Sequence, residues 1–224
     1  MLEDWLANAY EGMSRRQFLA RMSAAAGATL AGFAIASHPV AGEVITTSTD
    51  GLAVADGKVP SADVQIPIYE ARPSADGKYP VVLVIPEIFG MHEHIKDVTR
   101  RFGKEGFLGI TFEPYAREGG VLHLKDIPAV RKVADPVPDA RVMGDLDAIA
   151  AYAKRHPAGK ADRIGVTGFC RGGLYTLLYA AHNHDVRAAV PWYGQIKPAK
   201  TIGVRTAGPL DVAPRIRAPI LGLY

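Results

Sequence analysis

The sequence contains one cysteine, Cys170, in 224 residues. No disulfide can therefore form within the chain, and a fold stapled by disulfides is excluded. The chain also has no large excess of either positive or negative charge, because 26 basic and 23 acidic residues leave a formal net charge of only +3. No basic stripe with interleaved aromatic residues occurs, so we exclude nucleic acid as a partner.

The sequence also lacks an apolar run long enough to cross a bilayer. Its small-residue apolar stretch, 22–36, has about 15 residues, whereas a spanning helix needs about 20. Directly before it, Ser14-Arg15-Arg16-Gln17-Phe18-Leu19 is typical of a twin-arginine export signal. Cleavage is expected after Ala36 or Ala41. An amphipathic first helix is the alternative, but paired arginines before a featureless Ala/Gly run do not favour it.

We therefore expect residues 1–41 to be an export signal and cleavage region that the twin-arginine machinery recognises. The mature protein would be periplasmic or secreted, without a stable membrane span. In that oxidising compartment a lone thiol is a liability unless it has a chemical role, so the single cysteine indicates chemistry.

The remaining residues, 42–224, predict one α/β domain. Apolar runs predict strands, and apolar residues at helical spacing predict helices between them. The expected strands are 64–69, 81–85, 107–112, 163–167, 188–192 and 218–224. The expected helices are one that carries Ile95, Val98 and Phe102 and stops at Gly106, one over 139–156, and one that begins after Cys170. This alternation favours a mostly parallel sheet with helices on both faces.

Proline placement gives two further expectations. Pro67 has no N–H to donate, which predicts that strand 64–69 lies at an edge of the sheet. The proline-punctuated stretch from Glu113 to Pro138 is too long for an ordinary connection and is expected to be a functional loop.

Cys170 is the centre of the segment Gly168-Phe169-Cys170-Arg171-Gly172. This is the G-x-nucleophile-x-G pattern of a strand-to-helix elbow, with a thiol as the nucleophile. The glycines remove Cβ atoms that would collide with neighbouring backbone. The helix N-terminus is expected to favour the thiolate over the thiol. A small buried cysteine in a tight turn is the alternative, but a strand before and a helix after favour a nucleophile.

Two motifs together resemble the dienelactone hydrolase family of the α/β-hydrolase fold. They are Pro86-Glu87-Ile88-Phe89-Gly90 after the strand 81–85, and the cysteine elbow 168–173. Residues 162–167 are similar to that family's strand before the nucleophile, and 113–117 to its loop after the preceding strand. The resemblance covers about 64–224. It implies hydrolysis of a cyclic enol ester, such as a dienelactone from ring-cleavage degradation of aromatic compounds.

The resemblance also implies roles for individual residues. Cys170 would attack the lactone carbonyl and form an acyl-enzyme thioester, with the backbone N–H groups of Ile88 and Arg171 holding the oxyanion. Glu87 would lie beside the thiol in the resting site, where we expect it to position or deprotonate the sulfur. From the residues alone, a solvent-facing carboxylate at a strand end is an equal alternative for Glu87.

Four residues are candidates for the substrate pocket: Tyr115, His123, Trp192 and Tyr193. Surface placement is the alternative for His123, and core packing is the alternative for the aromatic pair 192–193.

The remaining histidines do not form a second site in the sequence. His92 and His94 are expected in a loop or at a helix start. His182 lies roughly 18 Å along its helix from the sulfur at 1.5 Å per residue, and His184 lies beyond it. No zinc-binding spacing occurs, so we expect no metal and no cofactor.

In this fold an acidic residue and then a histidine follow the nucleophile along the chain. The acid is expected just after the strand 218–224, where the sequence stops, so neither residue has a candidate. We therefore expect a C-terminally truncated hydrolase that is catalytically silent or poorly soluble as a 224-residue fragment.

Two other functions stay open. A general esterase or thioesterase would use the same scaffold and machinery, because a fold does not fix the substrate. A non-catalytic binding or thiol-redox protein would use Cys170 as a reversibly oxidised group. An Asp shortly beyond Tyr224 and a His some thirty residues later would favour an enzyme.

Overall fold

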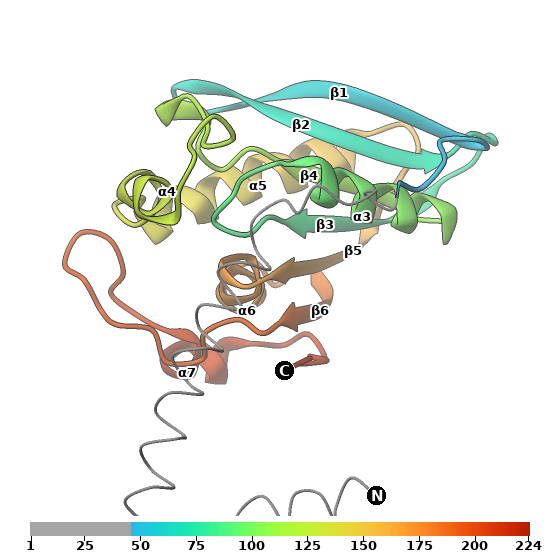
Figure 1. Cartoon of the computed structure of the whole chain (residues 1–224). Coiled ribbons are helices and arrows are strands. Elements are labelled where there is room, and N and C mark those ends of the chain that lie inside the picture. Colours follow the sequence, from blue (N-terminus) through green and yellow to red (C-terminus); the bar gives the residue numbers. More distant parts are fainter. Residues whose placement is uncertain (1–45) are drawn as a thin grey trace, which may run out of the picture. The chain divides into compact units, whose positions relative to one another are not determined.

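The computed structural model describes residues 46–224, which form one compact unit (Figure 1). The predicted export signal and cleavage region, 1–41, lie outside the described residues and stay a prediction. Within the described part, no helix has the length and apolar character needed to span a membrane.

The centre of this unit is a six-stranded sheet with the order β1-β2-β4-β3-β5-β6. The neighbours β3/β4, β3/β5 and β5/β6 run parallel, whereas β1/β2 and β2/β4 run antiparallel. The strands are β1 (Leu52–Ser61), β2 (Val64–Pro73), β3 (Tyr79–Ile85), β4 (Leu108–Phe112), β5 (Gly159–Phe169) and β6 (Val186–Trp192). The strands predicted from 64 onward are confirmed up to 192.

Helices cover both faces of the sheet (Figure 1). The reason is visible in β3, where Val81, Leu83 and Ile85 face one apolar cluster and Val82 and Val84 face another. The first cluster includes the buried faces of α5 and α6, and the second includes α3. The helices are α3 (Glu93–Lys104), α4 (Ile127–Ala134), α5 (Asp139–Arg155), α6 (Arg171–His182) and α7 (Pro209–Val212), with 3₁₀ turns η1 (Ala116–Glu118) and η2 (Ala213–Arg215). The expected α/β class with helices on both faces is confirmed.

The prediction that β2 lies at an edge is wrong. β2 pairs with β1 on one side and with β4 on the other, so β1 is the edge strand. The Pro67 carbonyl accepts from the Glu113 N–H at 2.9 Å, on the β4 side. A residue's N and O point to the same neighbour in an antiparallel pair, so the missing N–H also faces β4. The β2–β4 register begins at Ile68↔Phe112, and Pro67 therefore interrupts no ladder bond.

The stretch 113–138 is not one continuous loop, because it contains η1 and α4. The helix α4 was not predicted, although its first residues carry a local signal for a helix start. The Asp126 side chain caps it by accepting from the Ala129 N–H at 2.7 Å, and Pro128 occupies its first turn.

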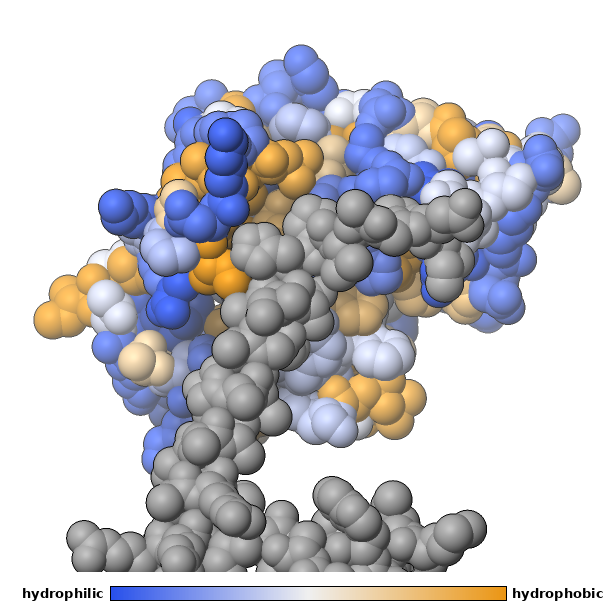
Figure 2. Space-filling view, viewed as in Figure 1, coloured by the Kyte–Doolittle hydropathy of each residue, from blue (hydrophilic) through white to orange (hydrophobic). Residues whose placement is uncertain are grey.

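The segment predicted as the strand 218–224 runs beside β6 without forming a full strand. Parallel bridges join Ala189 to Ile220 and Trp192 to Leu223. Next to it, on the sheet face that α3 partly covers, lies a hollow of about 820 Å³ lined mainly by apolar residues of α3, β3, β5, β6 and the segment itself. Leu221 is 60% exposed there. On the face drawn in Figure 2, apolar residues instead occur in small groups among hydrophilic ones.

The elbow depends on glycine because α6 begins against the end of β3. A Cβ on Gly172 would lie 2.2 Å from the Ile85 carbonyl oxygen and 2.6 Å from that of Pro86. Both obstacles are backbone atoms, which cannot rotate away as a side chain can.

We expect Gly172→Ala to lower the free energy of unfolding by about 2–3 kcal/mol, because overpacking at this contact must move backbone. Urea unfolding followed by circular dichroism measures the change. Gly144→Ala is the matched control, since a Cβ there meets nothing within 4 Å. In the interior of α5 this control should stabilise by roughly 0.5–1 kcal/mol. Equal stability of Gly172→Ala and the wild type would contradict the expectation.

Candidate functional site

Two carboxylates, a thiol and a phenol follow the carboxyl ends of four adjacent strands. Glu87 follows β3, Glu113 follows β4, Cys170 follows β5 and Tyr193 follows β6. Since β3, β4, β5 and β6 run parallel, these ends meet at one edge of the sheet. In open α/β sheets this edge is where ligands bind.

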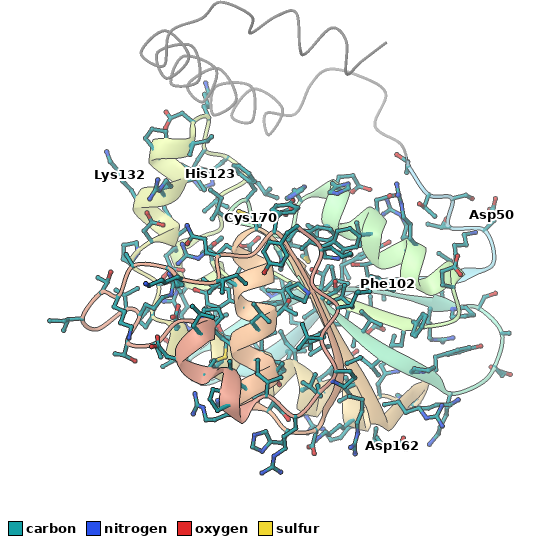
Figure 3. All side chains as sticks on the ribbon, turned by 90° about the horizontal axis from the view of Figure 1, so that it is seen from below. Asp50, Phe102, His123, Lys132, Asp162 and Cys170 are labelled. Carbon is teal, nitrogen blue, oxygen red and sulfur yellow. The ribbon has the colours of Figure 1, made fainter. Side chains whose placement is uncertain are left out.

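Cys170 has a strained backbone conformation between β5 and α6 (Figure 3). Its φ of 52° and ψ of −113° are rare for a residue with a side chain. Two hydrogen bonds hold it there, because its N–H donates to the Trp192 carbonyl at 3.0 Å and its carbonyl accepts from the Leu174 N–H at 3.1 Å. A Cβ on Gly168 would lie 2.5 Å from the Gly172 carbonyl oxygen. The predicted strand-to-helix elbow and its need for glycine are therefore confirmed.

The environment of the sulfur does not favour the thiolate. Cys170 is partly buried, and this burial is the main reason why the pKa of its thiol lies above the ordinary value. The Glu87 carboxylate raises it further, while the backbone N–H and the guanidinium of Arg171 act in the opposite direction. The helix start acts in the predicted direction, because the Arg171 N–H lowers the pKa of the thiol, but desolvation outweighs this local positive charge.

Glu87 is not a free carboxylate on the surface. Its side chain is 12% exposed, and its Oε2 lies 3.0 Å from Nε2 of His92. His92 occupies the N-cap position of α3 and stacks on the ring of His94 at 6.1 Å. The negative charge of Glu87 acts on the Cys170 thiol and raises its pKa.

Glu113 is a second carboxylate at this edge, and its side chain role was not predicted. It is buried and accepts two backbone hydrogen bonds, from Met91 to Oε2 and from Tyr115 to Oε1, both at 3.0 Å. Burial raises the pKa of this carboxyl group against the effect of both N–H groups. One signal could have found it: like Glu87, it directly follows a buried apolar strand.

The two predicted oxyanion donors come from different segments of the chain, the turn after β3 and the start of α6. The Arg171 N–H is at the start of α6, directly after Cys170, and it lowers the pKa of the thiol. Ile88 belongs to the turn after β3, whose hydrogen bonds come from Gly90 to the Glu87 carbonyl and from His92 to the Gly90 carbonyl. Neither bond uses the Ile88 N–H.

Tyr193 and Tyr115 differ in exposure. Tyr193 is 46% exposed and has a positive φ of 39°. Burial, followed by the charges of Glu87 and Cys170, raises its pKa to about 12. Tyr115 is buried at the start of η1, and its pKa is raised by burial against the opposing charge of Arg171.

The other two pocket candidates are Trp192 and His123. The Trp192 ring stacks on Phe169 at 5.3 Å, and its Nε1 donates to the Thr167 hydroxyl at 3.1 Å. His123 is exposed in the segment before α4 (Figure 3).

The histidines at the far end of α6 are remote from the elbow, as predicted. His182 Nε2 pairs with Asp147 at 2.7 Å instead. Across residues 46–224, no group of three His, Cys, Asp or Glu side chains is arranged to hold a metal ion.

Comparison with known proteins assigns the fold. A crystal structure of a "Putative Dienelactone Hydrolase" from Klebsiella pneumoniae subsp. pneumoniae superposes with a TM-score of 0.74 at 46% identity, covering 77% of this chain and 72% of that one. Pyrococcus horikoshii acylaminoacyl peptidase has a TM-score of 0.61 at 17% identity, covering 80% of this chain and 34% of that one. Together with the sheet and its elbow, these similarities show the α/β-hydrolase fold.

Comparison of sequences assigns the family. A Methylorubrum extorquens protein named "Putative carboxymethylenebutenolidase" is 47% identical over 210 residues, which are 92% of this chain and 71% of the relative. Residues 66–224 match the family model of the dienelactone hydrolase family. This chain belongs to the dienelactone hydrolase family of hydrolases.

Proposed function

We propose that this hydrolase opens a lactone or enol ester of the dienelactone type with Cys170 as its nucleophile. One observation carries the proposal. A strained elbow presents a partly buried thiol at the carboxyl edge of the sheet, with the Glu87 carboxylate and the Arg171 N–H beside it. Strain of this kind persists where the surrounding structure fixes it, and it concentrates at active sites.

The proposed reaction has two steps. The deprotonated sulfur attacks the carbonyl carbon, and the N–H groups of Ile88 and Arg171 hold the oxyanion that forms. The ring C–O bond then breaks, leaving a thioester on Cys170 and an enolate that takes up a proton. In the second step water hydrolyses the thioester, which releases the ring-opened acid and restores the thiol.

Glu87 is proposed to control the proton of Cys170. Its negative charge disfavours a neighbouring thiolate, which suits a resting site that is protonated and unreactive. The same carboxylate is a base within reach when substrate excludes water from the site. A thiol with a raised pKa is a poor redox sensor, since oxidation requires thiolate character and exposure. This weighs against the thiol-redox function.

Complete turnover is proposed to need an acid and a histidine besides the described groups. Deacylation requires a base that activates water, and in this fold that base is a histidine. Within residues 46–224, the His182–Asp147 pair lies at the opposite end of α6 from Cys170. We therefore propose that the groups of residues 46–224 support acylation of Cys170 but not hydrolysis of the thioester.

Export through the twin-arginine route also stays a proposal, supported by the segment 14–19. Residues 46–224 contain a single cysteine, which is compatible with an oxidising compartment. Degradation of an aromatic compound is the proposed context, since ring cleavage generates dienelactones.

Acylation of the sulfur tests the nucleophile. With p-nitrophenyl acetate at pH 9, we expect about one p-nitrophenolate per chain and an acetyl group on Cys170 by mass spectrometry. The nitrophenolate leaving group needs no general acid, so attack alone suffices. Cys170→Ala should release none above background. An unmodified Cys170 after a measurable ester cleavage would refute the proposed nucleophile, and steady turnover would refute the need for further groups.

The pH dependence of alkylation tests the charge of Glu87. Burial and Glu87 raise the thiol pKa, so the thiolate forms at higher pH in the folded protein than in the unfolded chain. Iodoacetamide should therefore label folded Cys170 more slowly than urea-unfolded Cys170 at pH 8. Glu87→Gln should shift the labelling profile to lower pH and speed labelling several-fold at pH 8. Glu93→Gln is the control, because Glu93 pairs with Arg100. An upward shift in Glu87→Gln would contradict the assignment.

Replacement of the arginine pair tests the export signal. Changing both Arg15 and Arg16 to Lys should retain the protein in the cytoplasm, because the receptor reads the arginines rather than their charge. Cell fractionation and immunoblotting measure the distribution, with Arg21→Lys as the control. Unchanged export of the double variant would exclude the twin-arginine route.

A further inference from the structure

Glu113 is a buried carboxylate that the proposed reaction does not use. It lies directly after β4, and its own N–H donates to the Pro67 carbonyl of β2 at 2.9 Å. Its backbone is therefore fixed to the sheet, and its side chain points from that anchor toward the neighbouring loop after β3. A buried carboxylate is expensive in free energy unless hydrogen bonds compensate it.

The two hydrogen bonds that compensate Glu113 join two separate loops. Oε2 accepts from Met91, in the loop after β3, and Oε1 accepts from Tyr115, in the turn after β4. The carboxylate thus acts as a bridge between segments that no ladder bond of the sheet connects. Each bond satisfies a backbone N–H that lies outside any strand.

The loop after β3 is shaped around this carboxylate. Gly90 has a φ of +71°, and a Cβ at this position would lie 2.6 Å from Oε2 and 2.8 Å from Oε1 of Glu113. Two independent constraints therefore require glycine at position 90. The turn that carries Glu87 and Ile88 closes directly onto Glu113.

We propose that Glu113 is a positioning residue that fixes the turn 87–90, and through it the Ile88 N–H and the Glu87 carboxylate, beside Cys170. The inference rests on the proposed function for the consequence in catalysis, but the bridge itself is a property of the fold. Catalytic groups require this kind of support, because a misplacement of about 1 Å can cost about 100-fold in rate.

Glu113→Gln is the test variant because it keeps the size of the side chain but removes one acceptor. In glutamine an NH₂ group replaces one of the two carboxylate oxygens and cannot accept a hydrogen bond from a backbone N–H. Either the Met91 N–H or the Tyr115 N–H therefore loses its acceptor. Glu118→Gln is the matched control. Glu118 lies in the same segment and pairs with Arg141 at 2.8 Å.

Three measurements on the full chain separate the possibilities. Hydrogen exchange of peptides covering 86–92 reports the position of the turn without any chemistry. Acylation by p-nitrophenyl acetate requires the oxyanion N–H groups, whereas alkylation by iodoacetamide requires only an accessible sulfur. In Glu113→Gln we expect faster exchange in 86–92, acylation slowed at least about 10-fold and alkylation within about 2-fold of wild type. Glu118→Gln should match the wild type in all three.

Unchanged exchange in 86–92 in Glu113→Gln, or acylation and alkylation slowed equally, would overturn the positioning role. If the wild type itself is not acylated, the proposed function fails, while the exchange measurement still decides the role of Glu113. Should Glu113→Gln not fold, Gly90→Ala disturbs the same contact from the other side. It should reproduce the faster exchange and the selective loss of acylation, and wild-type behaviour of Gly90→Ala would equally overturn the proposal.

Discussion

The close backbone approach between the first turn of α6 and the end of β3 determines the site. Gly172 lies so near the Ile85 and Pro86 carbonyls that a single Cβ would displace one of them. This contact brings the residue after β5 beside the residues after β3. Cys170 is consequently near Glu87, although 83 positions separate them in the sequence. The hydrogen bond from the Cys170 N–H to Trp192 ties the elbow to β6 in the same way.

The two carboxylates at this edge have different environments and, in our proposal, different tasks. Glu87 is partly exposed, pairs with the ring of His92 and raises the pKa of the Cys170 thiol. Glu113 is buried, accepts only backbone N–H groups and joins two loops. A carboxylate whose oxygens both accept from backbone donors is suited to positioning, whereas one that acts on a neighbouring thiol is suited to proton chemistry. The same residue type thus serves the chemistry and the architecture of one site.

How well each structural feature could be predicted depended on how far apart in the sequence its interacting residues lie. Elements with strong apolar patterns, such as β3 and α5, were predicted because the spacing of their apolar residues within a short segment indicates which positions are buried. Pro67 was misassigned because its permitted place depends on where the β2–β4 ladder begins, which no local pattern reveals. β1 was overlooked because most of its side chains are exposed, so it lacks an apolar signal. The short helix α4 did have a local signal, in its Asp126 cap and Pro128.

The sequence by itself determined the elbow, its glycines, the cysteine at its centre and the family resemblance. These features depend on neighbouring residues and on the Cβ atoms that the glycines lack. Tertiary structure alone decided the direction in which the pKa of Cys170 shifts, because burial of the sulfur outweighs the helix N-terminus. It also decided the partner of Glu87 and the bridge made by Glu113. These last features depend on distances between segments that are far apart in the chain, and on desolvation, which exists only once the chain has folded.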